Sequence, residues 1–279
     1  MVTTRAQIDS ILRHLIAAYE GAFAECELSY YLIGSWAEGE ANALSNIDVA
    51  IVWTPAELTE DHRAHAERIL ARLASPIRLD VGMMVEHDVP ASPIGVNLKL
   101  SSTHLSGPDI RERLPLPPLE QYTQSAVEAA YVFMSRILRG TEASDDINYP
   151  DPEDEFFGYA RKRVEAWYPA EITSGLKEWV STATRIVRAL VAMQHGRYVG
   201  SKGEAIAAYR TDIGDDWSPY LSTLYGKGKI EWAYRVPDDE DERVLLRELC
   251  RRFLAFERHF LAAARQYRVY AKDDTFLNS

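Results

Sequence analysis

Gly34 and Ser35 follow the apolar segment 30–33 and have the residue types of a phosphate-binding turn. Glycine adopts backbone angles that other residues avoid, which allows a sharp turn at the end of a strand. Ser35 is then expected to begin a short helix, whose first N–H groups have no partner within the helix and suit a phosphate. Gly34 and Ser35 are therefore predicted to bind the phosphates of a nucleotide.

Oxygen-bearing side chains lie on the next two apolar segments, 47–53 and 77–85. Asn46 and Asp48 are two residues apart, so their side chains point to one face of a strand. Asp80 is a lone carboxylate on an otherwise apolar run. Side-chain oxygens beside a phosphate-binding turn are suited to hold Mg²⁺ for a nucleotide. We therefore predict Asn46, Asp48 and Asp80 as metal ligands, with Asp48 and Asp80 as catalytic residues. The alternative is that both aspartates are ordinary residues at strand ends.

The elements that must position these residues follow from the spacing of apolar side chains. Helical spacing predicts helices over 4–24 and 57–73, and apolar runs predict strands over 28–33, 47–53, 77–85 and 94–100. The proline-rich stretch 105–118 is a candidate boundary. After it, helical spacing recurs over 119–139, 153–168, 171–195, 201–211, 217–225 and 241–268. We expect an α+β (mixed α/β) domain over 1–106 and an all-α helical-bundle domain over 107–279.

Composition and charge narrow the classes of partner. The chain has 279 residues, of which 47% are apolar and 26% are charged, as in folded globular proteins. A net charge of −11 argues against nucleic acid as the main partner and suits a cationic small molecule. The charged residues among the first twenty argue against a signal peptide, and no apolar run is long enough to span a membrane. The expected compartment is the cytoplasm.

Gly34, Ser35, Ser45 and Asp48 form the pattern Gly-Ser-x9-Ser-x-x-Asp, which resembles the signature of the DNA-polymerase-β-like nucleotidyltransferase superfamily. That signature normally ends in Ser-Asp-x-Asp, and Asn46 replaces its first aspartate. An amide oxygen is a neutral ligand, whereas Mg²⁺ prefers charged oxygens. Three explanations remain open: a degenerate enzyme that keeps nucleotide binding, an enzyme with one firmly held metal, or an experimental substitution that traps a substrate complex.

Residues 182–210 resemble part of the helical domain of the streptomycin/spectinomycin (aminoglycoside) adenylyltransferases, and the Leu-x-Gly-Pro segment 105–108 resembles the segment that opens it. The resemblance implies that Lys202 reaches the nucleotide phosphates and that Glu178 and Trp179 contact a cationic acceptor. The alternatives are a solvated lysine at a helix start, an exposed helix charge and a core tryptophan.

The resemblance implies a reaction as well as a fold. It implies that ATP, with Mg²⁺, donates AMP to a hydroxyl of a small, aminoglycoside-like acceptor in a cleft between the domains, an activity linked to antibiotic resistance. The glutamate that serves the family as catalytic base has no counterpart in 95–101, which leaves Glu86 and Asp88 as candidates. A second hypothesis is a catalytically inactive, nucleotide-binding or protein-binding member of the same fold. A third, modification of a protein or a tRNA end, is disfavoured for RNA by the net charge.

Overall fold

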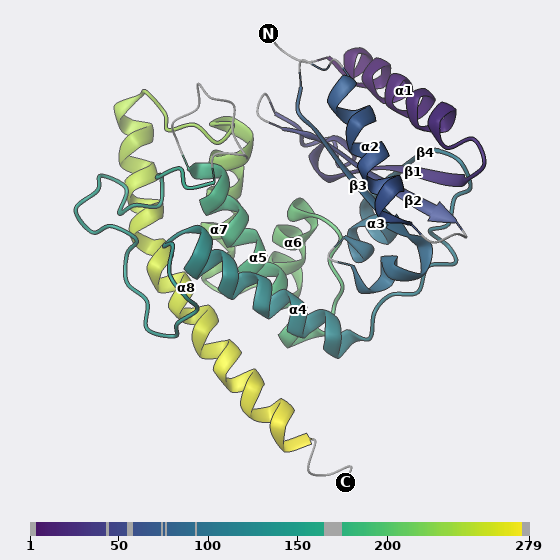
Figure 1. The fold of residues 1–279 in the computed structure, drawn as a ribbon. Coiled ribbons are helices and arrows are strands. Elements are labelled where there is room, and N and C mark those ends of the chain that lie inside the picture. Colours follow the sequence, from purple (N-terminus) through teal and green to yellow (C-terminus); the bar gives the residue numbers. More distant parts are fainter. Residues whose placement is uncertain are drawn as a thin grey trace. The chain divides into compact units, whose positions relative to one another are not determined.

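The computed structural model describes residues 4–42, 45–54, 58–73, 75, 77–92, 94–164 and 175–274, with side chains up to residue 267. The chain divides into two compact units, Met1–Pro117 and Pro118–Ser279. The first unit combines helices with a sheet, and the regular elements of the second are helices (Figure 1). The α+β class that the sequence predicted is confirmed.

A four-stranded sheet in the order β3-β2-β1-β4 forms the centre of the first unit. Its strands are β1 (Glu27–Ile33), β2 (Ile47–Thr54), β3 (Leu79–Val85) and β4 (Thr103–Ser106). β1 runs antiparallel to β2 and β4, whereas β2 and β3 run parallel. Ile33 pairs with Asp48, and Asp48 pairs with Asp80. The C-terminal end of β1 therefore lies beside the N-terminal ends of β2 and β3.

Two amphipathic helices, α1 (Arg5–Ala22) and α2 (Glu60–Arg72), cover one face of this sheet (Figure 1). Leu12 of α1 and Ala66 of α2 belong to the same buried cluster as Ile51 of β2. Both helices begin at a threonine whose side chain accepts a hydrogen bond from the backbone three residues later. Such caps fix where a helix starts, because they satisfy N–H groups that the helix itself leaves without partners.

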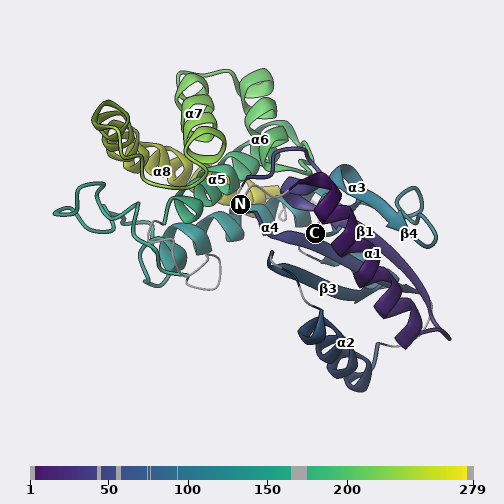
Figure 2. The same ribbon diagram turned by 90° about the horizontal axis from the view of Figure 1, so that it is seen from above.

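The other face of the sheet is covered by α3 (Gly95–Ser101) and by the chain that follows β4 (Figure 2). Tyr31 of β1 is buried in this second cluster with Ile110 and Leu114. The hydroxyl of Tyr31 accepts a hydrogen bond from the N–H of Ile110 at 2.8 Å. Residues 107–117, which the sequence analysis assigned to the helical domain, thus pack on the sheet.

One predicted strand, 94–100, is wrong, because this segment forms the helix α3. Alternating apolar residues in so short a run fit either structure, and contacts outside the run decide the outcome. Gly95 packs directly against the preceding turn, where an added Cβ would lie 2.1 Å from the carbonyl oxygen of Val89. The fourth strand is β4 instead, which the sequence analysis did not predict.

The second unit packs its helices around α5, which is buried along most of its length. Its helices are α4 (Leu119–Val132), α5 (Leu176–His195), α6 (Lys202–Ala208), α7 (Trp217–Tyr225) and α8 (Glu240–Asp274). The helix predicted over 153–168 is wrong in its described part, since 153–160 form turns and 161–164 are not helical, and 165–168 lie outside the described residues. Among the described residues, no helix combines the length and the hydropathy that a membrane span requires.

Among the described residues of the second unit, three helical stretches have π geometry, in which the backbone bonds to the fifth residue back instead of the fourth. They are Phe133–Ile137 after α4, Tyr209–Ile213 after α6 and Gly226–Glu231 after α7. The N–H of Leu138, for example, donates to the carbonyl oxygen of Phe133 at 3.0 Å. Each stretch continues the preceding helix with a wider turn.

A buried ion pair joins α8 to the segment that follows the first π stretch. Arg139 donates to both carboxylate oxygens of Glu257, at 2.7 Å each, and the hydroxyl of Tyr159 donates to Glu257 at 2.5 Å. The side chain of Arg139 is 8% exposed, and that of Glu257 is fully buried. Burial and the neighbouring Glu257 raise the pKa of Tyr159 well above its usual value, so this hydroxyl keeps its proton and acts as a donor.

Candidate functional site

The turn after β1 is shorter than the sequence analysis predicted. Gly34 has a φ of +69°, in the region that favours glycine. The residues Gly34–Trp36 form a single 3₁₀ turn, closed by hydrogen bonds from the N–H groups of Ala37 and Glu38 to the carbonyl oxygen of Gly34. One turn carries little of the charge that builds up at the end of a long helix. A phosphate at this turn would therefore depend on local donors, such as the Ser35 hydroxyl, more than on a helix dipole.

The carboxylate of Asp48 packs directly over this turn. A Cβ added to Gly34 would lie 2.7 Å from Oδ2 of Asp48, closer than real Cβ contacts. Asp48 comes from β2 and lies opposite Ile33, the last residue before the glycine. Gly34 thus serves two purposes, since it permits the positive φ and leaves space for the carboxylate.

Asp80 of β3 is the direct register partner of Asp48 on the parallel strand. Directly paired residues of neighbouring strands point to the same face, so the two carboxylates lie on one face at one end of the sheet. Asn46 lies on this face as well, two residues before Asp48. The structure therefore brings together the three residues that the sequence analysis predicted as metal ligands. Their role as ligands stays a prediction.

Both oxygens of Asp80 already accept hydrogen bonds. The side-chain nitrogen of Asn46 donates to Oδ2 at 2.8 Å, and Nε of Arg78 donates to Oδ1 at 2.7 Å. The amide orientation follows from this contact, because the carbonyl oxygen of Asn46 would repel a carboxylate at hydrogen-bond distance. Asn46 therefore acts as a donor to Asp80 in this arrangement, whereas the sequence analysis predicted its oxygen as a metal ligand.

The sequence analysis did not single out Arg78, although a signal for it was present. Arg78 precedes Asp80 by two residues, as Asn46 precedes Asp48, so strand alternation places all four on one face. The backbone supports this placement, since the N–H of Ile47 donates to the carbonyl oxygen of Arg78 at 2.9 Å. The face thus carries two carboxylates, one amide and one guanidinium.

We expect Gly34→Ala to lower the free energy of unfolding of the first unit by about 1 kcal/mol more than Gly39→Ala. Gly39 also has a positive φ, +73°, but an added Cβ there meets nothing within 4 Å. Both variants are destabilised by the positive φ, and only in Gly34→Ala does the new Cβ clash with Asp48. Urea denaturation of both variants measures the difference.

A third variant assigns the cause of that difference. Adding Asp48→Ala to Gly34→Ala removes the atom that the new Cβ would meet, so the extra cost should disappear from the double-mutant cycle. Equal costs for Gly34→Ala and Gly39→Ala would contradict the close approach of Asp48 to the turn.

Neither candidate for the catalytic base lies near Asp80. Glu86 follows the far end of β3, about 20 Å along the strand from Asp80 by the rise of about 3.3 Å per residue. It pairs with Arg113 at 2.6 Å and accepts a hydrogen bond from Thr54 at 2.8 Å. The hydrogen bond from Arg113 lowers the pKa of Glu86, which makes this carboxylate a weaker base. Asp88 lies farther still along the chain and is exposed.

The set of donors at the sheet end fits one divalent cation better than two. Asp48 and Asp80 supply two charged oxygen ligands from adjacent strands. Within the part of the chain that the structure describes, no three His, Cys, Asp or Glu side chains gather closely enough to hold a metal ion. Two Mg²⁺ ions need more negative charge than two carboxylates supply.

In the second unit, Lys202 lies at the start of α6, next to the capping residue Ser201. Its ammonium group donates to the hydroxyl of Ser181 on α5 at 2.8 Å. Arg185 and Arg188 follow Ser181 at helical spacing, so they share its face of α5. This face is basic in a chain whose net charge is −11. The contact of Lys202 with nucleotide phosphates stays a prediction.

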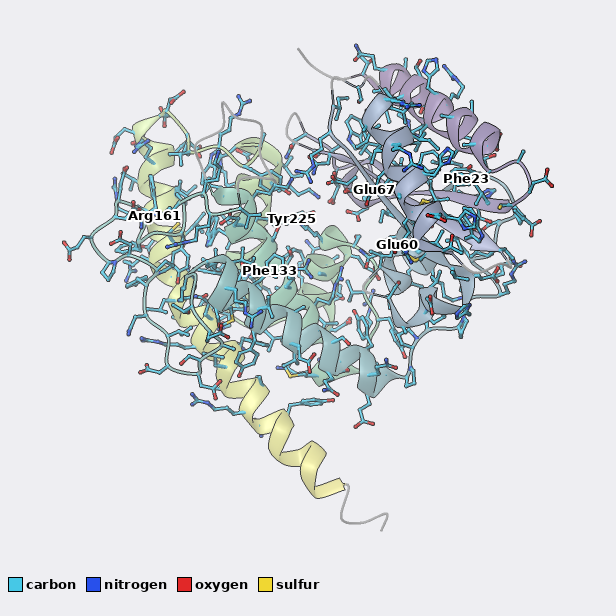
Figure 3. The ribbon with its side chains drawn as sticks, viewed as in Figure 1. Phe23, Glu60, Glu67, Phe133, Arg161 and Tyr225 are labelled. Atoms are coloured by element: carbon cyan, nitrogen blue, oxygen red, sulfur yellow. The ribbon has the colours of Figure 1, made fainter. Side chains whose placement is uncertain are left out.

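Arg185 belongs to this basic face and is largely shielded from water. Its guanidinium stacks on Phe133, with 3.9 Å between the guanidinium carbon and the ring centroid; Figure 3 labels Phe133. Burial, with a smaller contribution from the nearby Arg188, lowers the pKa of Arg185 to about 10. A buried cation held by an aromatic ring gains from a nearby anion.

Glu178 and Trp179, the residues predicted to contact an acceptor, are both fully buried at the start of α5. The carboxylate of Glu178 accepts hydrogen bonds from the backbone N–H groups of Arg163 and Val164, at 2.9 and 2.6 Å. The ring of Trp179 meets Phe253 edge-on, with 5.9 Å between centroids. In this structure both side chains hold the helical core together, and a role in binding an acceptor stays a prediction.

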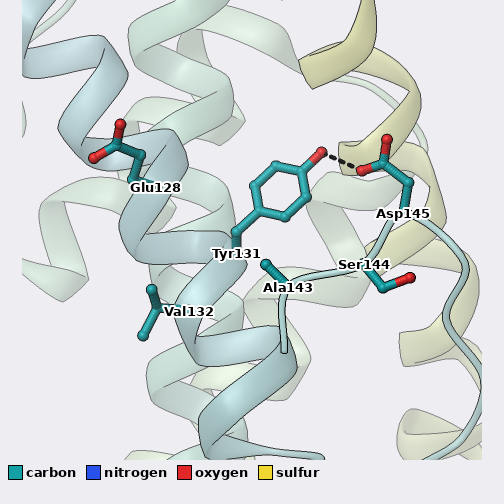
Figure 4. A pocket seen from close by; sticks show the side chains of 6 residues that line it. All are labelled: Glu128, Tyr131, Val132, Ala143, Ser144 and Asp145. Carbon is teal, nitrogen blue, oxygen red and sulfur yellow. Dashed lines mark hydrogen bonds between the residues drawn. The ribbon is translucent and has the colours of Figure 1, made fainter. Parts of the chain in front are cut away.

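Two pockets are lined by residues other than those predicted for the site. One, of about 600 Å³, opens between α4 and the segment 143–145, where Tyr131 donates a hydrogen bond to Asp145 at 2.7 Å (Figure 4). The other, of about 370 Å³, lies in the first unit and is lined by Ile11, His14, Arg72, Leu73 and Leu79. Neither pocket contains a residue that the sequence analysis predicted for the site.

Comparisons with known proteins add little to this description. No family model matches the chain, and no curated protein matches its sequence. Among solved structures, the chain is similar to spectinomycin adenyltransferase AAD(9) from Enterococcus faecialis, crystallised with ATP and spectinomycin. The TM-score is 0.44 with 11% sequence identity, over 89% of this chain and 100% of that chain. So weak a similarity transfers neither a site nor a substrate.

Proposed function

We propose that the first unit binds a nucleoside triphosphate with a divalent cation, and that the chain transfers the nucleotidyl group to a hydroxyl of a small acceptor. One observation carries the proposal: Asp48 and Asp80 are register partners on parallel strands, and Asp48 packs over the Gly34 turn. In this arrangement two carboxylates, which could bind a cation, lie beside a turn whose hydrogen-bond donors, such as the Ser35 hydroxyl, could bind a phosphate.

Each residue has a definite part in this proposal. Asp48 and Asp80 would hold the cation, and Gly34 leaves the space that Asp48 needs. Ser35 would donate its hydroxyl to a phosphate oxygen. A bound Mg²⁺ would neutralise charge on the phosphates and polarise the phosphorus that reacts.

The reaction consists of one displacement at phosphorus. The acceptor oxygen forms a bond to the α-phosphorus, the bond to the β-phosphate oxygen breaks, and pyrophosphate leaves. The acceptor hydroxyl loses its proton to solvent or to a base supplied with the acceptor. Glu86 and Asp88 are left out of this role because of their distance along the chain from Asp80 and, for Glu86, its bonds to Arg113 and Thr54.

ATP as donor of AMP and a cationic, aminoglycoside-like acceptor both follow from the resemblance of residues 182–210 and 105–108 to the aminoglycoside adenylyltransferases. The acceptor has a second support in the net charge of −11, which attracts cations to the protein. We propose Lys202 as a further phosphate contact, on the basic face of α5 and α6.

A second candidate function is nucleotide binding without transfer. The contacts of Asp80 favour it, because Asn46 and Arg78 occupy both carboxylate oxygens. Two carboxylates in place of three also weaken the charge that activates the acceptor hydroxyl. The two candidates share nucleotide binding and differ only in the chemical step.

Calorimetric titration with ATP and Mg²⁺, followed by a transfer assay with labelled ATP and a panel of aminoglycosides, tests both candidates. We expect binding by the chain and by Asn46→Asp, and faster transfer by Asn46→Asp. Asp48→Asn should weaken ATP binding at least tenfold, or about 1.4 kcal/mol. The matched control is Glu67→Gln, which removes one negative charge from the exposed side of α2 (Figure 3) and should leave binding unchanged.

The outcomes separate the candidates. Binding with no transfer by the chain or by Asn46→Asp would support the binding protein. No binding by either, or equal effects of Asp48→Asn and Glu67→Gln, would overturn the proposed nucleotide site.

A further inference from the structure

The charge on the sheet end differs from that of a three-carboxylate site by two units. Asp48, Asp80 and Arg78 carry a net formal charge of −1, and Asn46 is neutral. With an aspartate in place of Asn46 and no arginine, the same face would carry −3. The difference equals the charge of one divalent cation. Asn46 and Arg78 each account for one unit of it, and each directly precedes one of the two paired strands.

The contacts show how the arginine takes part. Arg78 donates to Oδ1 of Asp80, and Asn46 donates to Oδ2 of the same carboxylate. Asp80 therefore has a cation on one side and an amide N–H on the other. A second metal ion beside Asp80 would meet the guanidinium, and like charges at this distance repel.

We propose that this site holds one divalent cation between Asp48 and Asp80, and that Arg78 supplies the positive charge that a second cation supplies in a three-carboxylate site. The inference rests on the proposed function, since it concerns the same nucleotide site.

The exposure of Arg78 and Asp80 would allow the guanidinium of Arg78 to bind a phosphate. The side chain of Arg78 is 46% exposed and that of Asp80 is 36% exposed, so water weakens their ion pair. The guanidinium can therefore exchange the carboxylate for a phosphate oxygen at small cost, and guanidinium groups bind phosphates well. A single Mg²⁺ and Arg78 would together neutralise the triphosphate.

Counting bound cations tests the proposal without relying on activity. The probes are Mn²⁺, whose free form is measured by electron paramagnetic resonance, and an ATP analogue with a methylene group between its α and β phosphates. We expect one Mn²⁺ per chain in the complex with the analogue. The double variant Asn46→Asp/Arg78→Ala should bind two, because it restores the third carboxylate and removes the guanidinium. The control Arg68→Ala, which removes an exposed arginine of α2, should still bind one.

Calorimetry of the analogue runs alongside the count and keeps the two proposals apart. Binding of the analogue with two Mn²⁺ in the unmodified chain would overturn the single-cation proposal and leave the nucleotide site standing. One Mn²⁺ in both the chain and the folded double variant would overturn the role of Arg78. No binding of the analogue by the unmodified chain would overturn the proposed function and this inference together. The count on the unmodified chain decides the number of cations even if the double variant fails to fold.

Discussion

Glu257→Ala should lower the free energy of unfolding of the helical unit by about 3–5 kcal/mol. Arg139 is buried and donates two hydrogen bonds to the carboxylate of Glu257, which also accepts one from Tyr159. Without Glu257, the guanidinium remains in the core as an uncompensated charge. The cost comes mainly from this stranded charge and less from the lost attraction.

Hydrogen exchange of peptides from α4 and α8, read by mass spectrometry across a urea series, measures this change in the helical unit itself. The matched control is Glu248→Ala on the same helix, which breaks an exposed ion pair with Arg251 and should cost about 0.5 kcal/mol or less. Replacing both Arg139 and Glu257 with methionine should cost less than Glu257→Ala, because no buried charge is left. Similar losses in the free energy of unfolding for Glu257→Ala and Glu248→Ala would show that the buried pair does not stabilise the packing of α8 on the rest of the unit.

Gly107→Ala should be the most damaging glycine-to-alanine substitution of the first unit, with a loss of about 3 kcal/mol or more. Gly107 has a φ of +77°, and an added Cβ would lie 1.9 Å from the carbonyl oxygen of Leu28. That oxygen belongs to β1 and cannot move without disturbing the sheet. The substitution therefore combines backbone strain with a clash against backbone.

A urea denaturation curve of the purified variant, read by far-ultraviolet circular dichroism, checks this prediction, with Gly39→Ala as control. In Gly39→Ala only the positive φ lowers the free energy of unfolding, by about 1 kcal/mol. A loss for Gly107→Ala no larger than that of Gly39→Ala would contradict the close packing of residue 107 on β1.

The sequence predicted most of the elements of the first unit because its apolar runs are bounded by turn residues. The strands predicted over 28–33, 47–53 and 77–85 are confirmed as β1, β2 and β3. The strand predicted over 94–100 failed because seven residues of alternating polarity fit a strand or a helix equally well. In the helix that forms, Gly95 packs against the carbonyl oxygen of Val89, and no local pattern records that contact.

The site shows a similar division between local and long-range information. Strand alternation placed Asn46 and Asp48 on one face, and the same reasoning would have found Arg78 beside Asp80. The register that makes Asp48 and Asp80 neighbours depends on strand pairing and could not be read from either segment.

Burial in the helical unit was harder to foresee than the strands. A core position was one of the two alternatives for Trp179, whereas the burial of Glu178 was not predicted, because α5 is buried on nearly all sides. Arguments from one polar and one apolar helix face do not apply to such a helix.

The three π stretches have a consequence for tracing the ancestry of this chain. A π turn holds one residue more than the α turn it replaces, so the side chains within it leave the pattern of the α-helix before it. Each of the described stretches is the last part of its helix, after Val132, after Ala208 and after Tyr225. An alignment that forbids gaps inside helices would therefore misplace the residues of these last turns. Distant relatives should be aligned with single-residue gaps allowed there.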